Sequence, residues 1–298
     1  MKPGAGEDAV VRRLARLAGK PGPGVVAGIG DDCAVVRPAA EGRLVLLKTD
    51  CVVEGRHFTL SHPATAVGWK SACRAVSDIA ACGGLPRHAL ITCVLRAGQE
   101  GRWLDGVYRG LAKAAREFGF GIVGGDLSRM DGPAVINVAL TGEVERERLA
   151  GRGGGRPGDV LFVTGRLGGS LASGRHLRFS PRLNEARWLT GNFPVNAMMD
   201  LSDGLASDLP RLAAASGTGF AIDPASVPRQ RGVSVAQALG DGEDYELLFA
   251  VPPRAEAALR PAWKRRFPRL ALTRIGKLAA AGVASGLDGA RGFDHFSS

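Results

Sequence analysis

The sequence predicts an α/β protein (α+β) of two domains, and three observations support this fold class. The chain has 298 residues, more than one domain needs, because single hydrophobic cores stop growing near ~250 residues. Apolar residues make up 45% of the chain and charged residues 23%, which is usual for a globular protein. Apolar residues recur in some segments with the period of a helix, and β-rich segments lie between them. Strands and helices are therefore expected to alternate.

The first half begins with an expected helix at 8–18, followed by a Gly/Pro-rich break at 19–24. In the segment 65–82, apolar residues recur at three- and four-residue steps, while Lys70, Arg74 and Asp78 fall on another face. The other elements expected in this half are strands at 44–48, 88–95 and 134–141, a helix at 103–118, and a strand that ends at Gly124-Gly125-Asp126.

A glycine-rich connector, Gly151 to Gly158, indicates the domain boundary. It predicts an N-terminal domain at 1–150 and a C-terminal domain at 151–298. The elements expected beyond it are strands at 159–164, 219–222, 246–251 and 270–275 and a helix from about Leu205.

The N-terminus and the cysteines exclude several classes of protein. The first residues lack the apolar core of a signal peptide, and no apolar run approaches the ~18 residues of a membrane span, so a cytoplasmic protein without a membrane partner is expected. The five cysteines are scattered and never spaced as Cys-x-x-Cys, which fits neither a disulfide framework nor a zinc site. Reduced thiols are the prediction.

The formal net charge of +10 favours anionic partners, either a nucleotide or a nucleic acid. Basic stretches such as Arg12-Arg13 and Lys264-Arg265-Arg266 lack the interleaved aromatic residues that single-strand binding uses. Nucleic acid is therefore not the expected partner, and a solvated basic surface is the alternative to a ligand site.

Aspartates beside glycines or at expected strand ends are the most informative feature. They occur as Gly30-Asp31-Asp32, Thr49-Asp50, Ser77-Asp78, Gly124-Gly125-Asp126 and Asp200-Leu201-Ser202-Asp203-Gly204. Carboxylates are the ligands with which proteins hold magnesium next to phosphates. Singly, each has a structural alternative as a helix cap or turn residue. As a set gathered in one cleft, carboxylates ~5 Å apart would repel by about 3 kcal/mol per pair at an effective dielectric of 20 and would need cations.

Common nucleotide motifs are absent from the sequence. There is neither a P-loop nor a protein-kinase motif set. Gly153, Gly155 and Gly158 match Gly-x-Gly-x-x-Gly, but they precede a strand and include Pro157, so they do not join a strand to a helix as a dinucleotide-binding loop does.

An ordered set of motifs resembles the thiamine-monophosphate kinase family from the first helix almost to the C-terminus. The motifs are Gly28-Ile29-Gly30-Asp31-Asp32-Cys33-Ala34, Thr49-Asp50, Val53-Glu54-Gly55-Arg56-His57-Phe58, Ser77-Asp78, Gly124-Gly125-Asp126, Met199-Asp200-Leu201-Ser202-Asp203-Gly204-Leu205, Gly242-Glu243-Asp244-Tyr245-Glu246-Leu247-Leu248-Phe249 and Gly292-Phe293-Asp294-His295-Phe296. The resemblance implies the fold of the aminoimidazole ribonucleotide synthetase superfamily. In that fold the N-terminal sheets of two subunits pair into a dimer barrel, so a homodimer is expected.

The resemblance also implies roles for individual residues. The implied magnesium ligands are Asp32, Thr49, Asp50, Asp78, Asp126, Asp200 and Asp203. The implied ATP contacts are Tyr108, Gly125, Asp126, Arg152 and Ser202, and the implied thiamine-phosphate contacts are His57, Glu243 and Phe293. The alternatives without the resemblance are a core position for Phe293, a turn residue at Glu243, a structural histidine at His57, a partly buried helix residue at Tyr108 and a solvated charge at Arg152.

The implied reaction is ATP-dependent phosphorylation of thiamine monophosphate by magnesium-assisted in-line transfer, with several Mg²⁺ ions. The acceptor phosphate is already anionic, so no catalytic general base is expected, and Asp50, Asp78 and Asp126 are central as carriers of metal. Two rivals remain: a selenophosphate synthetase-like enzyme and a divergent nucleotide-binding paralogue. The first uses a Cys or selenocysteine in an early glycine-rich loop, but Cys33 follows the Asp pair and is better interpreted as a small buried residue.

Three departures from the family pattern bear on the metal count: Lys48 before Thr49-Asp50, Arg74-Ala75-Val76, and Leu127-Ser128 after Gly-Gly-Asp. On a strand Lys48 and Asp50 share a face. Lys48 either neutralises carboxylates of the cluster or extends to solvent.

Overall fold

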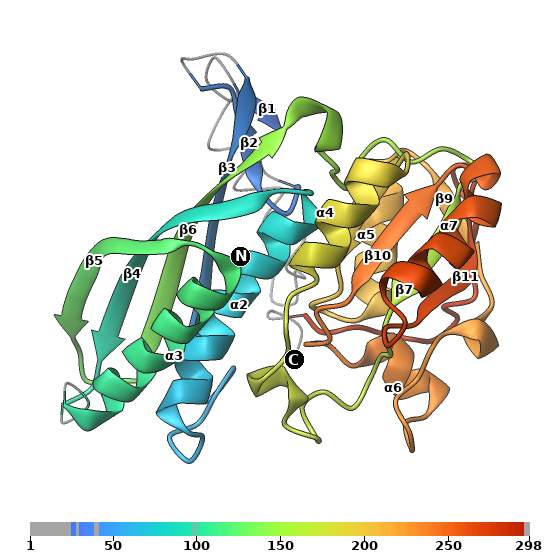
Figure 1. Ribbon diagram of the computed structural model, residues 1–298. Helices are drawn as coiled ribbons and strands as arrows, with labels where there is room; N and C mark the ends of the chain where they lie inside the picture. Colours follow the sequence, from blue (N-terminus) through green and yellow to red (C-terminus); the bar gives the residue numbers. More distant parts are fainter. Residues whose placement is uncertain (1–24, 28–29, 39–41, 98, 100, 295–298) are drawn as a thin grey trace.

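A computed structural model describes residues 25–27, 30–38, 42–97, 99 and 101–294, and Figure 1 shows its two α/β units. The expected helix at 8–18 lies outside the described residues. Among the described residues, no helix has the length and apolar character needed to cross a membrane.

The first unit is a six-stranded sheet with the order β1-β2-β3-β6-β4-β5. Neighbouring strands are antiparallel except β4 and β5, which are parallel. Helices α2 (Ala64–Ala81) and α3 (Arg102–Phe118) lie together on one side of this sheet (Figure 1). The strands are β1 (Val25–Ala27), β2 (Ala34–Val36), β3 (Arg43–Val53), β4 (Leu85–Leu95), β5 (Gly121–Arg129) and β6 (Val135–Glu145).

The second unit is a six-stranded sheet with the order β12-β9-β11-β7-β10-β8, in which only β12 and β9 are parallel. Its strands are β7 (Val160–Thr164), β8 (Ala197–Asp200), β9 (Gly219–Ile222), β10 (Leu247–Val251), β11 (Leu272–Ala279) and β12 (Ala284–Ser285). Its helices are α4 (Leu183–Asn192), α5 (Leu205–Ala215), α6 (Val235–Gly240) and α7 (Pro253–Arg266), and short 3₁₀ turns are η1 (Arg146–Arg148), η2 (Arg175–Leu177) and η3 (Pro224–Ser226).

Alternating burial along β3 gives the first sheet two different faces. Leu44, Leu46 and Val52 are buried beneath the helices, while Leu47 is 42% exposed on the other face. This period of two is the pattern of a strand covered on one side only.

Helices α2 and α3 pack closely because glycines lie where they cross. A Cβ on Gly68 of α2 would lie 1.9 Å from the Val107 carbonyl oxygen, and a Cβ on Gly110 of α3 would lie 2.0 Å from the Thr65 carbonyl oxygen. Only a residue without a side chain permits this approach of the two backbones.

Helix α2 also joins the two units. It contacts β3 and β6 of the first sheet, and also α4 and β8 of the second unit. One continuous core contains buried residues from both sheets, such as Val35 and Phe162. This packing places the C-terminal half of α2 where the two units meet.

The expected fold class is confirmed, and the elements expected from periodicity are present within the described residues. Two expectations about strand ends are wrong. Strand β3 continues past Asp50 to Val53, and β5 continues past Asp126 to Arg129, because pairing with β6 and β4 extends both strands. All five cysteines are free, as expected.

Candidate active site

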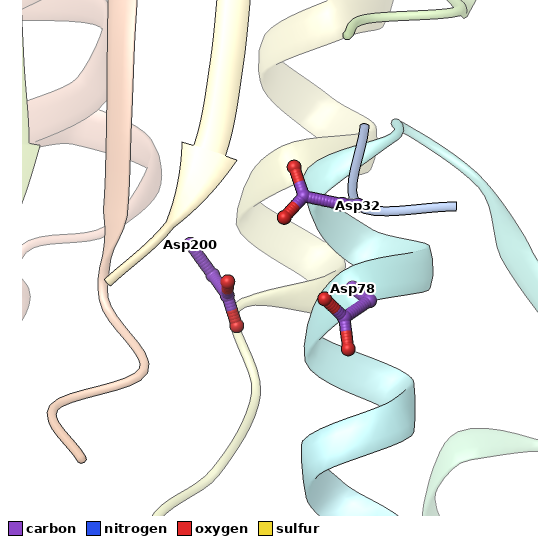
Figure 2. A group of neighbouring side chains, drawn as sticks. All are labelled: Asp32, Asp78 and Asp200. Atoms are coloured by element: carbon purple, nitrogen blue, oxygen red, sulfur yellow. The ribbon is translucent and has the colours of Figure 1, made fainter. Parts of the chain in front are cut away.

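Three aspartates from distant parts of the chain meet between the two units. Asp32 precedes β2, Asp78 lies on α2, and Asp200 ends β8 (Figure 2). Each offers a carboxylate oxygen, and these oxygens all lie within 4.8 Å of one another. All three residues are buried. We call Asp32, Asp78 and Asp200 the aspartate cluster.

The helix periodicity of α2 explains how Asp78 reaches this position. Lys70, Arg74 and Asp78 are spaced by four residues and therefore share one face of the helix. That face points away from α3 and toward the second unit, where Ser77 donates a hydrogen bond of 2.5 Å to Asp200. The polar face seen in the sequence is thus the face that carries the site.

Burial and like charges raise the proton affinity of the cluster. Burial is the largest cause of the raised pKa of Asp78, and Asp200, Asp50 and Asp32 add to it, while Lys48 opposes it. Burial and Asp32 raise the pKa of Asp200 from 3.8 to about 7. Oδ2 of Asp32 is buried without a hydrogen-bond partner among the described residues. The cluster therefore has both the charge and the free oxygen that a hard cation requires.

Cations from the chain already compensate part of this charge. Lys48 points into the cluster, with its Nζ 2.9 Å from Asp78 Oδ2. Burial alone would lower the pKa of Lys48, but the charges of Asp78 and Asp50 have the larger combined effect and raise the pKa overall. The side chain of Lys48 is therefore an ammonium ion. Of the two placements open for Lys48, the structure shows the one that neutralises carboxylates.

Two arginines make similar contacts. Arg74 contacts both carboxylate oxygens of Asp50, at 3.1 and 3.3 Å, and Arg152 donates to Asp32 Oδ1 at 2.7 Å. Burial alone would raise the pKa of Asp50, but Arg74 and Lys48 lower it overall. Asp50 therefore lies beside the cluster as an ionised carboxylate held by Arg74.

Two of the residues expected to bind substrate, His57 and Glu243, form a second group around Lys70, which is fully buried. Lys70 Nζ lies 2.5 Å from Glu243 Oε2 and donates to the His57 carbonyl oxygen at 2.9 Å. The guanidinium carbon of Arg56 lies 4.3 Å from the centre of the Phe293 ring. His57 and Glu243 are thus brought together, and Phe293 is held beside a cation.

The segment Glu243–Glu246 has an unusual backbone. Glu243 and Tyr245 have φ angles of 65° and 51°, in the left-handed region that non-glycine residues seldom adopt. The Glu243 and Tyr245 amides donate to the carbonyl oxygens of Ser202 (2.6 Å) and Leu201 (2.8 Å). These bonds hold the strained segment against the Asp200–Gly204 segment, which contains three of the expected site residues, Asp200, Ser202 and Asp203.

Other expected site residues are not brought to the cluster within this chain. Thr49 and Asp50 are adjacent on β3, so their side chains face opposite sides, and Thr49 donates to Asn137 on the outer face. Asp126 pairs with Thr92, whose neighbours Ile91 and Cys93 face the helices, so Asp126 also faces outward. It lies three strands from β3, about 14 Å at the usual strand spacing.

The remaining expected residues lie elsewhere or are paired. Gly125 lies on β5 next to Asp126. Tyr108 lies on α3, and its side chain is 39% exposed. Asp203 lies at the edge of the site, 2.5 Å from Arg211.

Sequence reasoning missed several residues of the site. Asp208 is buried beside Asp203, and burial and Asp203 raise its pKa to about 8. Lys70 and Ser77 were also not assigned to the site. The four-residue spacing of Lys70, Arg74 and Asp78 was a signal for Lys70, whereas nothing in the sequence indicated that Arg211 would compensate Asp203 and Asp208.

Comparison with known proteins defines the class first. Residues 30–144 match the N-terminal domain of AIR synthase related protein, and residues 156–285 match the C-terminal domain of AIR synthase related protein. The chain thus has both domains of an AIR synthase related protein.

Individual relatives then give the family. A thiamine-monophosphate kinase of Rhodopirellula baltica is 37% identical over 274 residues, which cover 86% of this chain and 84% of the relative. A thiamine-monophosphate kinase of Aquifex aeolicus is 34% identical over 279 residues, which cover 84% of this chain and 86% of the relative. The chain belongs to the thiamine-monophosphate kinase family, which confirms the resemblance found in its motifs.

Solved structures agree with this. AaThiL complexed with AMPPCP and TMP superposes with a TM-score of 0.83 at 32% identity and covers 97% of both chains. A hydrogenase maturation protein HypE has a TM-score of 0.69 at 20% identity, covers 84% of this chain and 85% of that chain, and shares the fold alone.

Proposed function

We propose that this chain transfers the terminal phosphate of ATP to the phosphate of thiamine monophosphate, forming thiamine diphosphate and ADP. The observation that carries the proposal is the buried aspartate cluster at the junction of the two units. Arg74 contacts both Asp50, beside this cluster, and Glu243 of the Lys70–Glu243 pair. The family and the relative complexed with AMPPCP and TMP support this choice of substrates.

The donor set of the cluster fits magnesium. It presents three carboxylate oxygens within 4.8 Å of one another, and Asp32 Oδ2 has no other partner among the described residues. Bound magnesium would neutralise charge on the phosphates between donor and acceptor. Asp50 and Asp203, which lie at the edge of the aspartate cluster, are proposed as additional magnesium ligands. Asp126 and Thr49 are proposed ligands that face the outer side of the sheet, so their role requires that a second protomer cover this face.

The chain's own residues supply the rest of the chemistry. Lys48 and Arg74 reduce the repulsion that two approaching phosphates would meet at Asp78 and Asp50. The proposed ATP contacts are Arg152, which donates to Asp32, and Tyr108, Gly125, Asp126 and Ser202. His57, Glu243 and Phe293 are the proposed pocket for the cationic thiamine ring, because carboxylate and aromatic groups both attract a cation. No side chain needs to remove a proton, since the attacking oxygen is already anionic.

The proposal is tested by measuring ADP release from ATP and magnesium with thiamine monophosphate, with unphosphorylated thiamine, or without an acceptor. We expect release only with thiamine monophosphate. Equal turnover of thiamine would show that the site does not recognise an acceptor phosphate. Absence of turnover with all acceptors, with ATP still bound, would indicate the divergent paralogue.

A selenophosphate synthetase-like activity is not favoured by the environment of Cys33. This side chain is 1% exposed and packs beside Cys82, and burial raises its thiol pKa. A reactive cysteine needs an accessible thiolate.

Lys48 gives a specific prediction about the metal requirement. Replacing Lys48 with Ser removes the ammonium that contacts Asp78, so an additional magnesium ion must take over its charge. We expect the magnesium concentration for half-maximal activity to rise about fivefold, equivalent to an ion pair worth about 1 kcal/mol, with a steeper dependence. Lys277→Ser, at an exposed lysine, is the control. An unchanged magnesium titration for Lys48→Ser would mean that Lys48 does not substitute for a cation.

The outer face of the first sheet supports the proposed homodimer. It exposes apolar side chains, among them Leu47 at 42% and Leu90 at 50%. We expect light scattering at micromolar concentration to give twice the mass of 31.0 kDa, and Leu90→Asp to shift the protein toward monomer. A wild-type monomer would remove the dimer barrel from the proposal. The proposal also includes a boundary between the two domains at about residue 150 and a cytoplasmic location for the protein.

A further inference from the structure

A basic cavity lies in the second unit, between the end of β7, helix α7 and the turn that leads into β11. Its volume is about 670 Å³. No residue that lines it belongs to the aspartate cluster or to the positions proposed for ATP and thiamine monophosphate. Six cationic side chains line it, Arg166, Arg175, Arg182, Arg260, Lys264 and Arg269, together with one carboxylate, Glu246. The proposed reaction uses none of these residues.

Most of the positive charge in the basic cavity is not compensated by the chain. Arg182 makes a two-point contact with Glu246, at 2.6 and 2.5 Å, and Arg175 pairs with Asp244 behind the wall. The other four cations form no ion pair in the part of the chain that the structure describes. Cations gathered around one hollow repel one another, so a bound anion with several charges would stabilise the arrangement.

A second observation comes from Arg175. Its Nη2 contacts Asp244, but its Nε is buried and has no hydrogen-bond partner among the described residues. A buried guanidinium N–H without an acceptor costs free energy. Arg175 also lines the cavity, and because the guanidinium fork matches phosphate oxygens, a phosphate group is the chemistry that suits this wall.

We propose that the basic cavity binds a small molecule with two or more adjacent phosphates. A single phosphate carries about −1.5 to −2 charges, too few to balance the four cations that have no ion pair among the described residues. The volume falls within the ~300–1,000 Å³ of small-molecule sites and leaves room for an organic group. Leu270 and Leu272 supply an apolar wall beside the charges.

The test titrates the full-length protein with inorganic pyrophosphate in EDTA, without ATP or thiamine monophosphate, and measures binding calorimetrically. Arg260→Ala/Arg269→Ala removes two exposed cations of the cavity. Arg254→Ala/Arg265→Ala removes two exposed arginines of α7 that do not line it, and is the matched control. We expect the cavity variant to bind pyrophosphate about tenfold or more weakly, because hydrogen bonds to charged groups are lost, and the control to bind like wild type.

Competition with ADP and with thiamine diphosphate then identifies the source of the phosphates. Displacement by either at lower concentration than pyrophosphate identifies an organic diphosphate, and failure of both to displace identifies inorganic pyrophosphate. The proposal is overturned if the wild type does not bind pyrophosphate, if the cavity variant binds it as tightly as wild type, or if both variants lose affinity equally. Because no kinase substrate or metal is present, this result does not depend on the proposed phosphoryl transfer.

Discussion

Asp200→Asn is expected to lower turnover with thiamine monophosphate at least about 100-fold. Metal ions typically contribute several kcal/mol of charge stabilisation in the transition state, and about 1.4 kcal/mol corresponds to a factor of ten. The variant keeps a side chain of the same shape and retains an oxygen for the Ser77 hydroxyl. Loss of activity should therefore come from the lost charge and not from unfolding.

The same variant gives an independent readout in the metal-free protein. The pKa of Asp200 is raised to about 7 from 3.8, so between these values the folded chain binds more protons than the unfolded chain. The contribution of Asp200 to the stability of the wild type should therefore fall as pH rises from about 4 to 7 and level off above that range. The amide side chain of the variant does not titrate, so the melting temperature of the wild type should fall relative to that of Asp200→Asn over this range.

Asp288→Asn, at an exposed aspartate outside the site, is the control. Near-normal turnover of Asp200→Asn with normal magnesium dependence would exclude Asp200 as a ligand.

Gly68→Ala is expected to destabilise the protein by about 3 kcal/mol, the upper part of the range for overpacking. In an open helix position this substitution would stabilise, since alanine is the better helix former. Here the new Cβ would lie 1.9 Å from the Val107 carbonyl oxygen, so α2 and α3 would have to separate. Thermal or urea unfolding measures the loss.

Gly121→Ala is the matched control. Its Cβ would meet only the Val123 side chain, at 3.6 Å, which is ordinary contact. Equal stability of the two variants would mean that the helix crossing adjusts at little cost.

The sequence predicted the elements in which one periodicity is dominant. The helix expected at 65–82 occurs as α2 (Ala64–Ala81), and the strand expected at 219–222 occurs as β9. Helix α7 was not expected, because Pro253 and Pro261 and many polar residues obscure its apolar face. Strand β8 has only four residues, too few for periodicity to distinguish it from a loop.

The site was predictable as a set of residues and much less as an arrangement. Asp32, Asp78 and Asp200 come from a loop, a helix and a strand end, so only the packing of α2 between the two units shows that they meet. The shared face of Lys48 and Asp50 followed from strand geometry, but the contact of Lys48 with Asp78 depends on the position of α2. The expected roles of Thr49, Asp126 and Tyr108 stay predictions, because the fold of this chain does not bring these residues to the cluster.

The left-handed backbone at Glu243 sets backbone strain against the pairing of a buried charge. Glycine would adopt the φ of 65° without strain, whereas other residues pay of order 1–3 kcal/mol. Glycine would also remove the carboxylate that contacts the fully buried Lys70, and breaking a buried ion pair by removing one partner costs about 3–5 kcal/mol. The strained glutamate is therefore the more stable choice at a position whose backbone suits glycine, because the buried charge of Lys70 requires a partner.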